Sequence, residues 1–128
     1  MIAKRFEDLI FWQKARELTK LVYTYSRKGK LKIDYGFKDQ IQRSSVSVMS
    51  NVAEGFGRGG NNEFIQFLFV AKGSLAEVQS LLYVAIDLDY ITALEFKKAF
   101  GITEEIARLI NSFIKSMKSG GNTSLKKK

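Results

Sequence analysis

The sequence predicts an all-α domain, specifically an antiparallel up-down four-helix bundle. Four separate segments carry apolar residues at spacings of three and four, the period of one buried helix face. Proline is absent from all 128 residues, although a β-rich domain of this size would use several at turns and sheet edges. With 45% hydrophobic residues, the chain is also long enough to bury a single core.

The first helix is expected over about residues 6–27. Acidic residues lie in its first turn and basic residues follow its last turn, as the helix dipole favours. Gly29 is expected to stop this helix, and a basic connection carrying Lys30 and Lys32 follows. The predicted buried face of the helix is Phe11, Ala15, Leu18, Val22 and Tyr25.

The second helix should begin between Asp34 and Phe37 and run to about Phe56. Its predicted buried face includes Ser45, one of four closely spaced serines. Small side chains at this density indicate close approach by another helix. Glycines around residues 55–60 then form a turn. The complete predicted face is Phe37, Ile41, Ser45, Val48 and Val52.

The third helix begins at Asn61 or Asn62, either of which can cap it. Its first half, residues 64–71, is apolar almost all round, and such a helix needs cover on every side. Because a four-helix monomer covers only one side, we expect a neighbouring subunit to bury part of it. The candidate interface residues are Phe64, Ile65, Phe67 and Phe69. The predicted core face is Phe64, Leu68, Ala71, Leu75, Val78, Leu82 and Ala85.

The fourth helix begins after Thr92, which has Glu95 three residues on and so predicts a capping box. Gly101 weakens this segment by about 1 kcal/mol relative to alanine, and Thr103 could cap a second helix there. We favour one long helix that is locally weakened at Gly101. The sequence thus predicts a bundle domain over residues 1–118 and a disordered basic tail over residues 119–128. The predicted buried face is Ile102, Ile106, Leu109, Phe113 and Met117.

Cysteine and histidine are both absent from the chain. Their absence excludes disulfides, thiolate or imidazole metal sites and every Ser-His or Cys-His nucleophile. We therefore expect no enzymatic activity, no cofactor and no bound metal. The sequence has neither a signal peptide pattern nor an apolar run of about twenty residues, so a cytoplasmic location without membrane contact is expected.

The net charge of +8 is unevenly distributed. Residues 1–38 hold ten Lys or Arg against four Asp or Glu, residues 39–118 hold eight against nine, and the tail adds three lysines. A basic surface attracts polyanions such as RNA or DNA without selecting between them, although a lysine-rich surface also serves solubility alone. Besides the tail lysines, the candidate phosphate contacts are Lys28, Lys30, Lys32, Arg43 and Arg58.

Three stretches of the sequence resemble a known family. Residues 6–15 contain Phe-Glu-Asp-Leu and Trp-Gln-Lys-Ala, and residues 64–77 contain Gly-Ser-Leu-Ala-Glu. The most specific stretch, residues 40–58, contains Gln-Ile-Gln-Arg-Ser-Ser-Val-Ser and Asn-Val-Ala-Glu-Gly-Phe-Gly-Arg. Over about residues 6–118 the chain resembles the bacterial four-helix-bundle proteins encoded in intervening sequences of 23S ribosomal RNA genes.

The resemblance implies a ring of antiparallel bundles, with a homopentamer as the favoured assembly, and no known enzymatic activity. The role of most members is unknown. Relatives include accessory proteins of diversity-generating retroelements, which are basic rings that bind nucleic acid and a reverse transcriptase. Two departures stand out. Gln42-Arg43 replaces a frequent pair of arginines, which removes one positive charge, and residues 31–33 lack a frequent proline.

The polar motif residues of the second and third helices are expected to be structural rather than catalytic. Asn51 and Glu54 have no base, metal ligand or second acid beside them. They are instead expected to form hydrogen bonds near the Gly73-Ser74 step, where a missing side chain lets helices approach. The glycines of residues 57–60 lack the strand and the Lys-Ser pair of a phosphate loop. The expected structural residues are Asn51, Glu54, Gly55, Gly73, Ser74 and Glu77.

One polar stripe of the second helix has two interpretations. It lines a binding groove or the hole of a ring, or its carboxylate pairs with its arginines, and such pairs at helical spacing are common. We favour the pairing. The stripe consists of Arg43, Ser47, Ser50, Glu54 and Arg58. For the whole chain, we predict a non-enzymatic ring that binds RNA or DNA. The alternative is a protein–protein adaptor or scaffold without nucleic-acid contact.

Overall fold

The computed structural model describes residues 3–120, and these residues form helices and no strands. The predicted fold class is therefore confirmed. Of the predicted tail, residues 121–128 lie outside the described part of the chain. The elements are the 3-10 helix η1 (Phe6–Asp8) and the α-helices α1 (Ile10–Tyr25), α2 (Gly29–Ile33), α3 (Tyr35–Gly57), α4 (Asn61–Asp87) and α5 (Ala93–Lys118).

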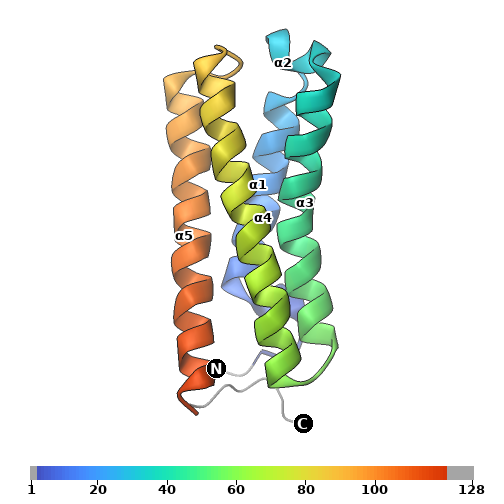
Figure 1. Cartoon of the computed structure of the whole chain (residues 1–128), viewed down its shortest axis with the longest axis vertical. Coiled ribbons are helices and arrows are strands. Elements are labelled where there is room, and N and C mark those ends of the chain that lie inside the picture. The colour runs from blue at the N-terminus through green and yellow to red at the C-terminus, as the bar shows by residue number, and fades with distance from the viewer. Residues whose placement is uncertain (1–2, 121–128) are drawn as a thin grey trace.

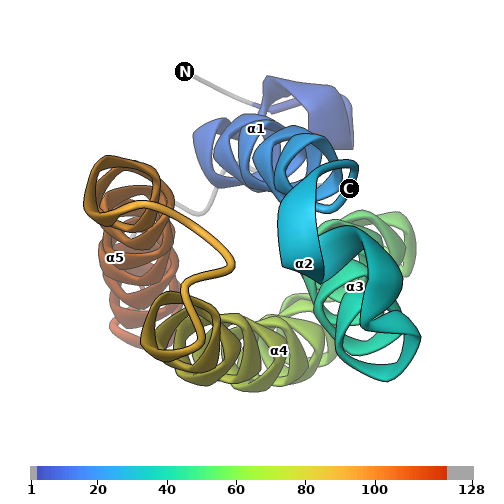
Figure 2. The same ribbon diagram turned by 90° about the horizontal axis from the view of Figure 1, so that it is seen from above.

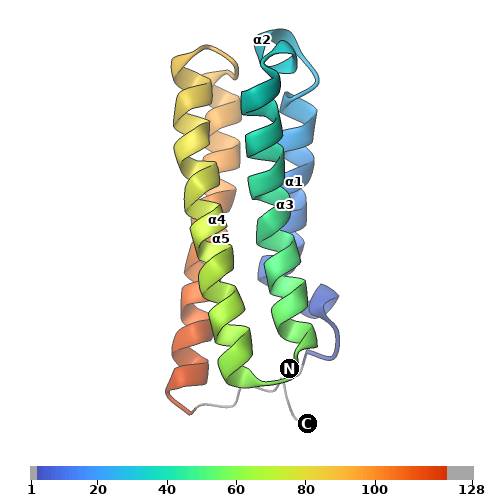
Figure 3. The same cartoon turned by 45° about the vertical axis from the view of Figure 1, so that its right-hand side comes forward.

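The four long helices stand side by side, and each runs antiparallel to its neighbours (Figures 1 and 3). Seen from above, α1, α3, α4 and α5 occupy the corners of a square (Figure 2). Both α1 and α4 pack against α3 and α5, so α1 and α4 lie at opposite corners. Each long helix therefore turns one face to the shared core and another face to solvent.

The core faces predicted for the first and third helices are confirmed at every position. In α3, Phe37 is only partly buried, whereas the other predicted residues are buried. In α5 the buried face is rotated slightly from the prediction. Leu109 and Phe113 are partly buried, because Ile110 and Ile114 turn further into the core. Phe113 still packs edge-to-face on the rings of Phe11 and Phe64.

The first connection carries the predicted lysines, and it contains the short helix α2, which was not predicted from the sequence. The first long helix ends at Tyr25, and Gly29 adopts a positive φ of 60° that the chain uses to turn. Leu31 is then buried against the end of the bundle, while Lys30 and Lys32 stay exposed. A single buried leucine thus anchors the turn and directs its lysines outward. The next helix starts as predicted, with the Asp34 carboxylate accepting a hydrogen bond from the Phe37 N–H.

The last long helix, α5, starts with the predicted capping box. Thr92 and Glu95 exchange two backbone–side-chain hydrogen bonds of 3.0 Å each. The helix continues unbroken through Gly101, so the single long helix is confirmed. Thr103 does not cap a second helix. Its hydroxyl donates to the Phe100 carbonyl oxygen and accepts a hydrogen bond from Gln79 of α4 at 2.9 Å.

The closest approach between α3 and α4 occurs at Gly55. A Cβ atom built there would lie 2.5 Å from the Phe67 Cβ and 3.0 Å from the Phe64 ring. Only glycine fits this contact, because real Cβ atoms do not approach so closely. At Gly73, by contrast, no atom lies within 4 Å of the position that a Cβ would take. The expectation of close packing at the Gly73-Ser74 step is therefore wrong for Gly73, which faces away from α3, whereas Ser74 does contact α3 through Ser47.

The most apolar helix of the bundle is α4. By length and composition it could cross a membrane, with a mean hydropathy of 1.3 in its most apolar window. Core helices of soluble proteins meet the same criterion, and nine residues of α4 are buried in the bundle. Only 33% of that window is buried, however. Much of the apolar surface of α4 therefore remains on the outside of this single chain.

Candidate nucleic-acid interface

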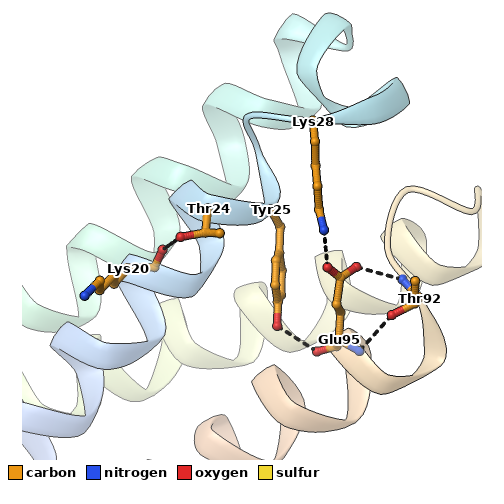
Figure 4. Close-up of polar contacts among 6 residues, drawn as sticks. All are labelled: Lys20, Thr24, Tyr25, Lys28, Thr92 and Glu95. Carbon is orange, nitrogen blue, oxygen red and sulfur yellow. Dashed lines mark hydrogen bonds and ion pairs between the residues drawn. The ribbon is translucent and has the colours of Figure 1, made fainter.

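Among the predicted phosphate contacts, Lys28 has a structural partner. Its ammonium group forms an ion pair with the Glu95 carboxylate, which also accepts a hydrogen bond from the Thr92 N–H (Figure 4). Tyr25 donates a hydrogen bond of 3.2 Å to the Glu95 carbonyl oxygen. Partial burial raises the pKa of Glu95, but the hydrogen bonds from Lys28 and Thr92 outweigh it, and the net pKa lies below the ordinary value of 4.5. Lys28 thus fastens the end of α1 to the start of α5.

A second polar contact closes the same end of the bundle. The Tyr90 hydroxyl donates to the Asp34 carboxylate at 2.5 Å, and this hydrogen bond, together with desolvation, raises the pKa of Tyr90. Lys30 and Lys32 lie beside this contact on α2. Both are exposed, and neither has a carboxylate partner within residues 3–120. They remain candidates for phosphate contact.

The two predicted arginines are each paired with an acid. Arg43 lies 3.4 Å from the Asp39 carboxylate, one turn earlier on α3. Arg58 donates to Glu54 at 2.9 Å, which raises the pKa of the guanidinium. Arg58 also lies 4.0 Å from Glu63. The pairing interpretation of the polar stripe is therefore confirmed for Glu54. Both pairs are exposed and screened by solvent, so they reduce the local positive potential without building a site.

Three cations without acidic partners among the described residues lie on the outer face of α1 and in the turn just after it. Arg16, Lys20 and Arg27 are exposed, and in the described part of the chain none of them contacts a carboxylate. Tyr23 lies between them on the same face and is 37% exposed. The spacing of four and three places Arg16, Lys20 and Tyr23 along one side of α1, and Arg27 lies in the turn that follows the helix. We call these four residues the basic stripe.

Sequence reasoning missed the basic stripe, although a signal was present. The stripe has the same helical spacing as the buried face of α1 and lies opposite to it, so projecting the charged residues on a helical wheel finds it. Within the stripe, the Arg16 guanidinium lies 5.9 Å from the centre of the Trp12 ring. This contact orients the arginine without neutralising its charge.

A groove of about 560 Å³ lies beside the basic stripe. Tyr23 forms its edge on the α1 side, and polar residues of α3 and α4 form its floor. The Ser47 and Ser74 hydroxyls are 2.8 Å apart across the two helices. The residues that line the groove are Tyr23, Gln40, Arg43, Ser44, Val46, Ser47, Ser74 and Glu77.

Two of the family-motif residues, Ser74 and Glu77, line this groove, and a third, Asn51, hydrogen-bonds to Ser47 of its lining. The Asn51 amide donates to the carbonyl oxygen of Ser47 at 2.8 Å and to its hydroxyl at 3.0 Å. Gln40 donates to the Glu77 carboxylate at 3.2 Å. The predicted hydrogen bond of Asn51 across the Gly73-Ser74 step is therefore not found, because Asn51 bonds to Ser47 of its own helix and it is Ser47 that meets Ser74. Glu54 does not join this network, because it turns to solvent and pairs with Arg58 on its own helix.

The predicted subunit interface divides into buried and exposed residues. Phe64 and Ile65 are buried in the core of their own chain, so they offer no surface to another subunit. Phe67 is partly buried against Gly55 and under the Arg58 guanidinium. Phe69 remains 45% exposed. The expectation that all four phenylalanine and isoleucine positions face a neighbour is therefore wrong for the first two, which α3 and α5 already cover.

The apolar surface left open on α4 extends along its outer face. Phe69 and Val70 begin it, Gly73 and Ala76 leave a shallow middle, and the exposed side chain of Tyr83 ends it. We call these five residues the apolar stripe. Lys72 and Lys118 place their ammonium groups over the Phe69 ring at 5.2 and 5.1 Å.

The described residues contain no group of three His, Cys, Asp or Glu side chains that could hold a metal ion. Asn51 and Glu54 do not hydrogen-bond to one another; each has its own partner. The groove offers hydrogen-bonding groups and an aromatic edge, which suit the binding of a ligand.

Comparison with known proteins agrees with the fold and the motifs. The model of the 23S rRNA-intervening sequence proteins matches residues 7–112, most of the described chain. The chain belongs to this family. A solved structure from Bacteroides thetaiotaomicron, a protein of unknown function in the S23 ribosomal protein family, superposes with a TM-score of 0.73. At 24% identity, covering 83% of this chain and 96% of the other, it shows a shared fold. No curated protein matches the chain.

Proposed function

We propose that this family member is a non-enzymatic, ring-forming protein of the cytoplasm that binds RNA or DNA through basic surface. The observation that carries the proposal is the basic stripe, where three cations without acidic partners in the described chain lie on one face of α1 and in the turn just after it. Phosphates bound there release counterions, which drives binding without base selection. Lys30 and Lys32 extend the positive surface at the end of the bundle.

Assembly is supported by the apolar stripe. An exposed apolar face of this kind marks an interaction site in a soluble protein, and its central Gly73 leaves room for a neighbouring helix. We propose that a second copy of the chain covers this apolar stripe. Repetition of the same contact then closes a ring, and five subunits are the favoured number. Since α1 and α4 lie at opposite corners, a neighbour that covers the apolar stripe does not itself cover the basic stripe. Repetition of the stripe then gives avidity.

The test measures binding of labelled RNA and DNA oligomers by fluorescence anisotropy across a salt series. The variant R16Q/K20Q/R27Q should weaken binding of both polymers and flatten the slope of log affinity against log salt by about 2 per subunit. The matched control is K97Q/R108Q/K115Q, which removes the same charge from exposed positions of α5. Equal losses of affinity in the two variants would show that binding depends on net charge and not on the basic stripe. Absence of any binding at low salt would reject nucleic-acid contact.

A protein–protein adaptor without nucleic-acid contact is the second candidate. It is favoured by one observation, the exposure of two leucines at the α4–α5 turn, Leu88 at 48% and Leu94 at 77%. Capture from native lysate with and without nuclease separates the two candidates. Partners that survive nuclease and are lost on Leu94→Glu support the adaptor.

The absence of catalysis is part of the proposal and has its own test. Incubation with RNA, DNA and nucleotides in the presence of magnesium or manganese should give no turnover. Turnover that disappears in Glu54→Ala, with the fold intact by circular dichroism, would assign an enzymatic role to this residue.

A further inference from the structure

The groove beside the basic stripe differs chemically from the stripe itself. Its edge is the half-exposed Tyr23 ring, with Val46 beside it, and its floor carries hydroxyl, amide and carboxylate groups. Its volume of about 560 Å³ falls within the range of small-molecule sites. The cations of the stripe present positive charge alone, whereas the groove presents an aromatic face and both donors and acceptors.

The charges of the groove argue against a phosphate as its occupant. Its one arginine, Arg43, is paired with Asp39, and Glu77 adds a carboxylate to the floor. An anion entering the groove would meet this carboxylate, and the Ser47 and Ser74 hydroxyls already bond to each other. A neutral group with hydrogen-bonding edges is a better match, and a nucleobase has both such edges and a flat face.

The position of Tyr23 links this groove to the basic stripe. Lys20 precedes it by three residues, about 5 Å along the helix, and Arg27 follows it by four residues, in the turn just after α1. A strand whose phosphates contact these cations therefore runs past the tyrosine ring. A duplex keeps its bases stacked inside, so only a single strand can turn a base onto an exposed aromatic side chain.

We infer that the groove edged by Tyr23 takes one unstacked nucleobase, and that the ligand of the basic stripe is a single strand. The phosphates lie on α1, the base stacks on the Tyr23 ring, and its edge faces Gln40 and Glu77. This inference rests on the proposed nucleic-acid binding and narrows its ligand to single-stranded RNA or DNA.

The experiment compares three ligands with the full-length protein: a single-stranded oligouridylate, an RNA duplex of equal length, and an abasic strand of equal length. Tyr23→Leu removes the aromatic face and keeps apolar bulk, and Tyr23→Phe keeps the ring. Tyr23→Leu should weaken oligouridylate binding about tenfold, the loss expected for one stacked base. It should leave duplex and abasic affinities unchanged, and Tyr23→Phe should bind like the wild type.

Two outcomes would overturn the inference. If Tyr23→Leu weakens binding of the single strand and the duplex equally, Tyr23 has a structural role. If it leaves oligouridylate affinity unchanged, no base stacks on Tyr23 in the groove. The variant R16Q/K20Q/R27Q distinguishes these failures from failure of the proposed function. If that variant loses binding while Tyr23→Leu does not, the basic stripe binds backbone alone.

Discussion

The outer faces of α1 and α4 occupy opposite corners of the same square, yet they carry different chemistry (Figure 2). The face of α1 presents Arg16, Lys20 and Arg27 without acidic partners among the described residues, and it suits water or a polyanion. The face of α4 presents apolar side chains from Phe69 to Tyr83. In a bundle every helix buries one face in the core, so two helices can differ in function only through their remaining faces.

The difference also explains why one face is stable alone and the other benefits from a partner. Exposed cations on α1 are solvated and cost nothing to leave in water. Burial of apolar surface contributes roughly 25 cal/mol per Å², so cover over Phe69 and Val70, which are 45% and 53% exposed, is favourable. We therefore expect changes on α1 to alter ligand binding and changes on α4 to alter assembly.

The largest expected effect is charge reversal on α1. The variant R16E/K20E/R27E should lose about 100-fold or more in nucleic-acid affinity at low salt, because three attractive contacts become repulsive. Glutamate is a good helix former, so circular dichroism should show an unchanged fold and light scattering an unchanged mass. If reversal of the α1 charges also dissociates the oligomer, the assignment of binding to α1 and of assembly to α4 is contradicted, since binding and assembly would then share one surface.

The second effect is loss of assembly through α4. The variant F69E/V70E should reduce the mass from light scattering to that of the 14.5 kDa monomer. The new carboxylate at residue 69 lies near Lys72 and Lys118, so the monomer should stay folded. Nucleic-acid affinity should then fall about tenfold or more through lost avidity.

Leu94→Glu is the matched control for this variant, because Leu94 is 77% exposed in the first turn of α5. A carboxylate there favours the helix dipole. Its mass should equal that of the wild type. An oligomer that persists in F69E/V70E, or that dissociates equally in Leu94→Glu, contradicts assembly through the apolar stripe.

Gly55 of α3 and Gly73 of α4 give a third, smaller effect, and the two substitutions should change stability in opposite directions. Gly55→Ala forces a Cβ against Phe67 and should reduce the free energy of unfolding by about 1 to 3 kcal/mol. Gly73→Ala meets no atom within the described chain and should stabilise the monomer by about 0.5 to 1 kcal/mol. Urea unfolding of both in the F69E/V70E background isolates the monomer. Equal destabilisation by the two changes would contradict the packing described for Gly55.

The periodic parts of this molecule were predictable from the sequence, and the long-range contacts were not. The core faces of α1 and α4 follow from helical spacing alone, because one stripe of each amphipathic helix must leave water. The Lys28–Glu95 pair joins residues 67 positions apart, and no local pattern announces it. Lys28 therefore looked like a free cation. The grouping of Arg16, Lys20 and Arg27 could have been predicted from their spacing. It was missed because the charges were counted by segment, and such a count does not show which face of a helix carries them.

Phe64 and Ile65 show a second limit of local reasoning. A helix that is apolar all round requires cover on every side, but sequence does not say which neighbour provides it. Here α4 crosses α3 closely at Gly55 and packs on α5, so both residues become core. Only the side beyond these two contacts, the one carrying Phe69 and Val70, is left for another chain.

The smallest expected effect concerns the contact that holds the end of α1 in place. Glu95→Gln keeps an oxygen for the Thr92 N–H but removes the charge that pairs with Lys28. Because the Lys28 side chain is 55% exposed, solvent screening limits the expected loss to about 0.5 to 1 kcal/mol near pH 7. Lys28→Gln should cost about as much, and the double variant should cost little more than either single one.

This loss should depend on pH in a direction set by Glu95. Its pKa in the folded protein lies below the ordinary value of 4.5, so the pair contributes its full stabilisation above that value. The contribution is lost as the pH falls through the lower, folded-state pKa, where the carboxylate becomes protonated. The difference in unfolding free energy between wild type and Glu95→Gln should therefore be constant from pH 7 to about pH 5 and shrink toward zero in more acidic buffer. A difference that grows on acidification, or that persists after protonation, would show that the pairing with Lys28 is not what lowers this pKa.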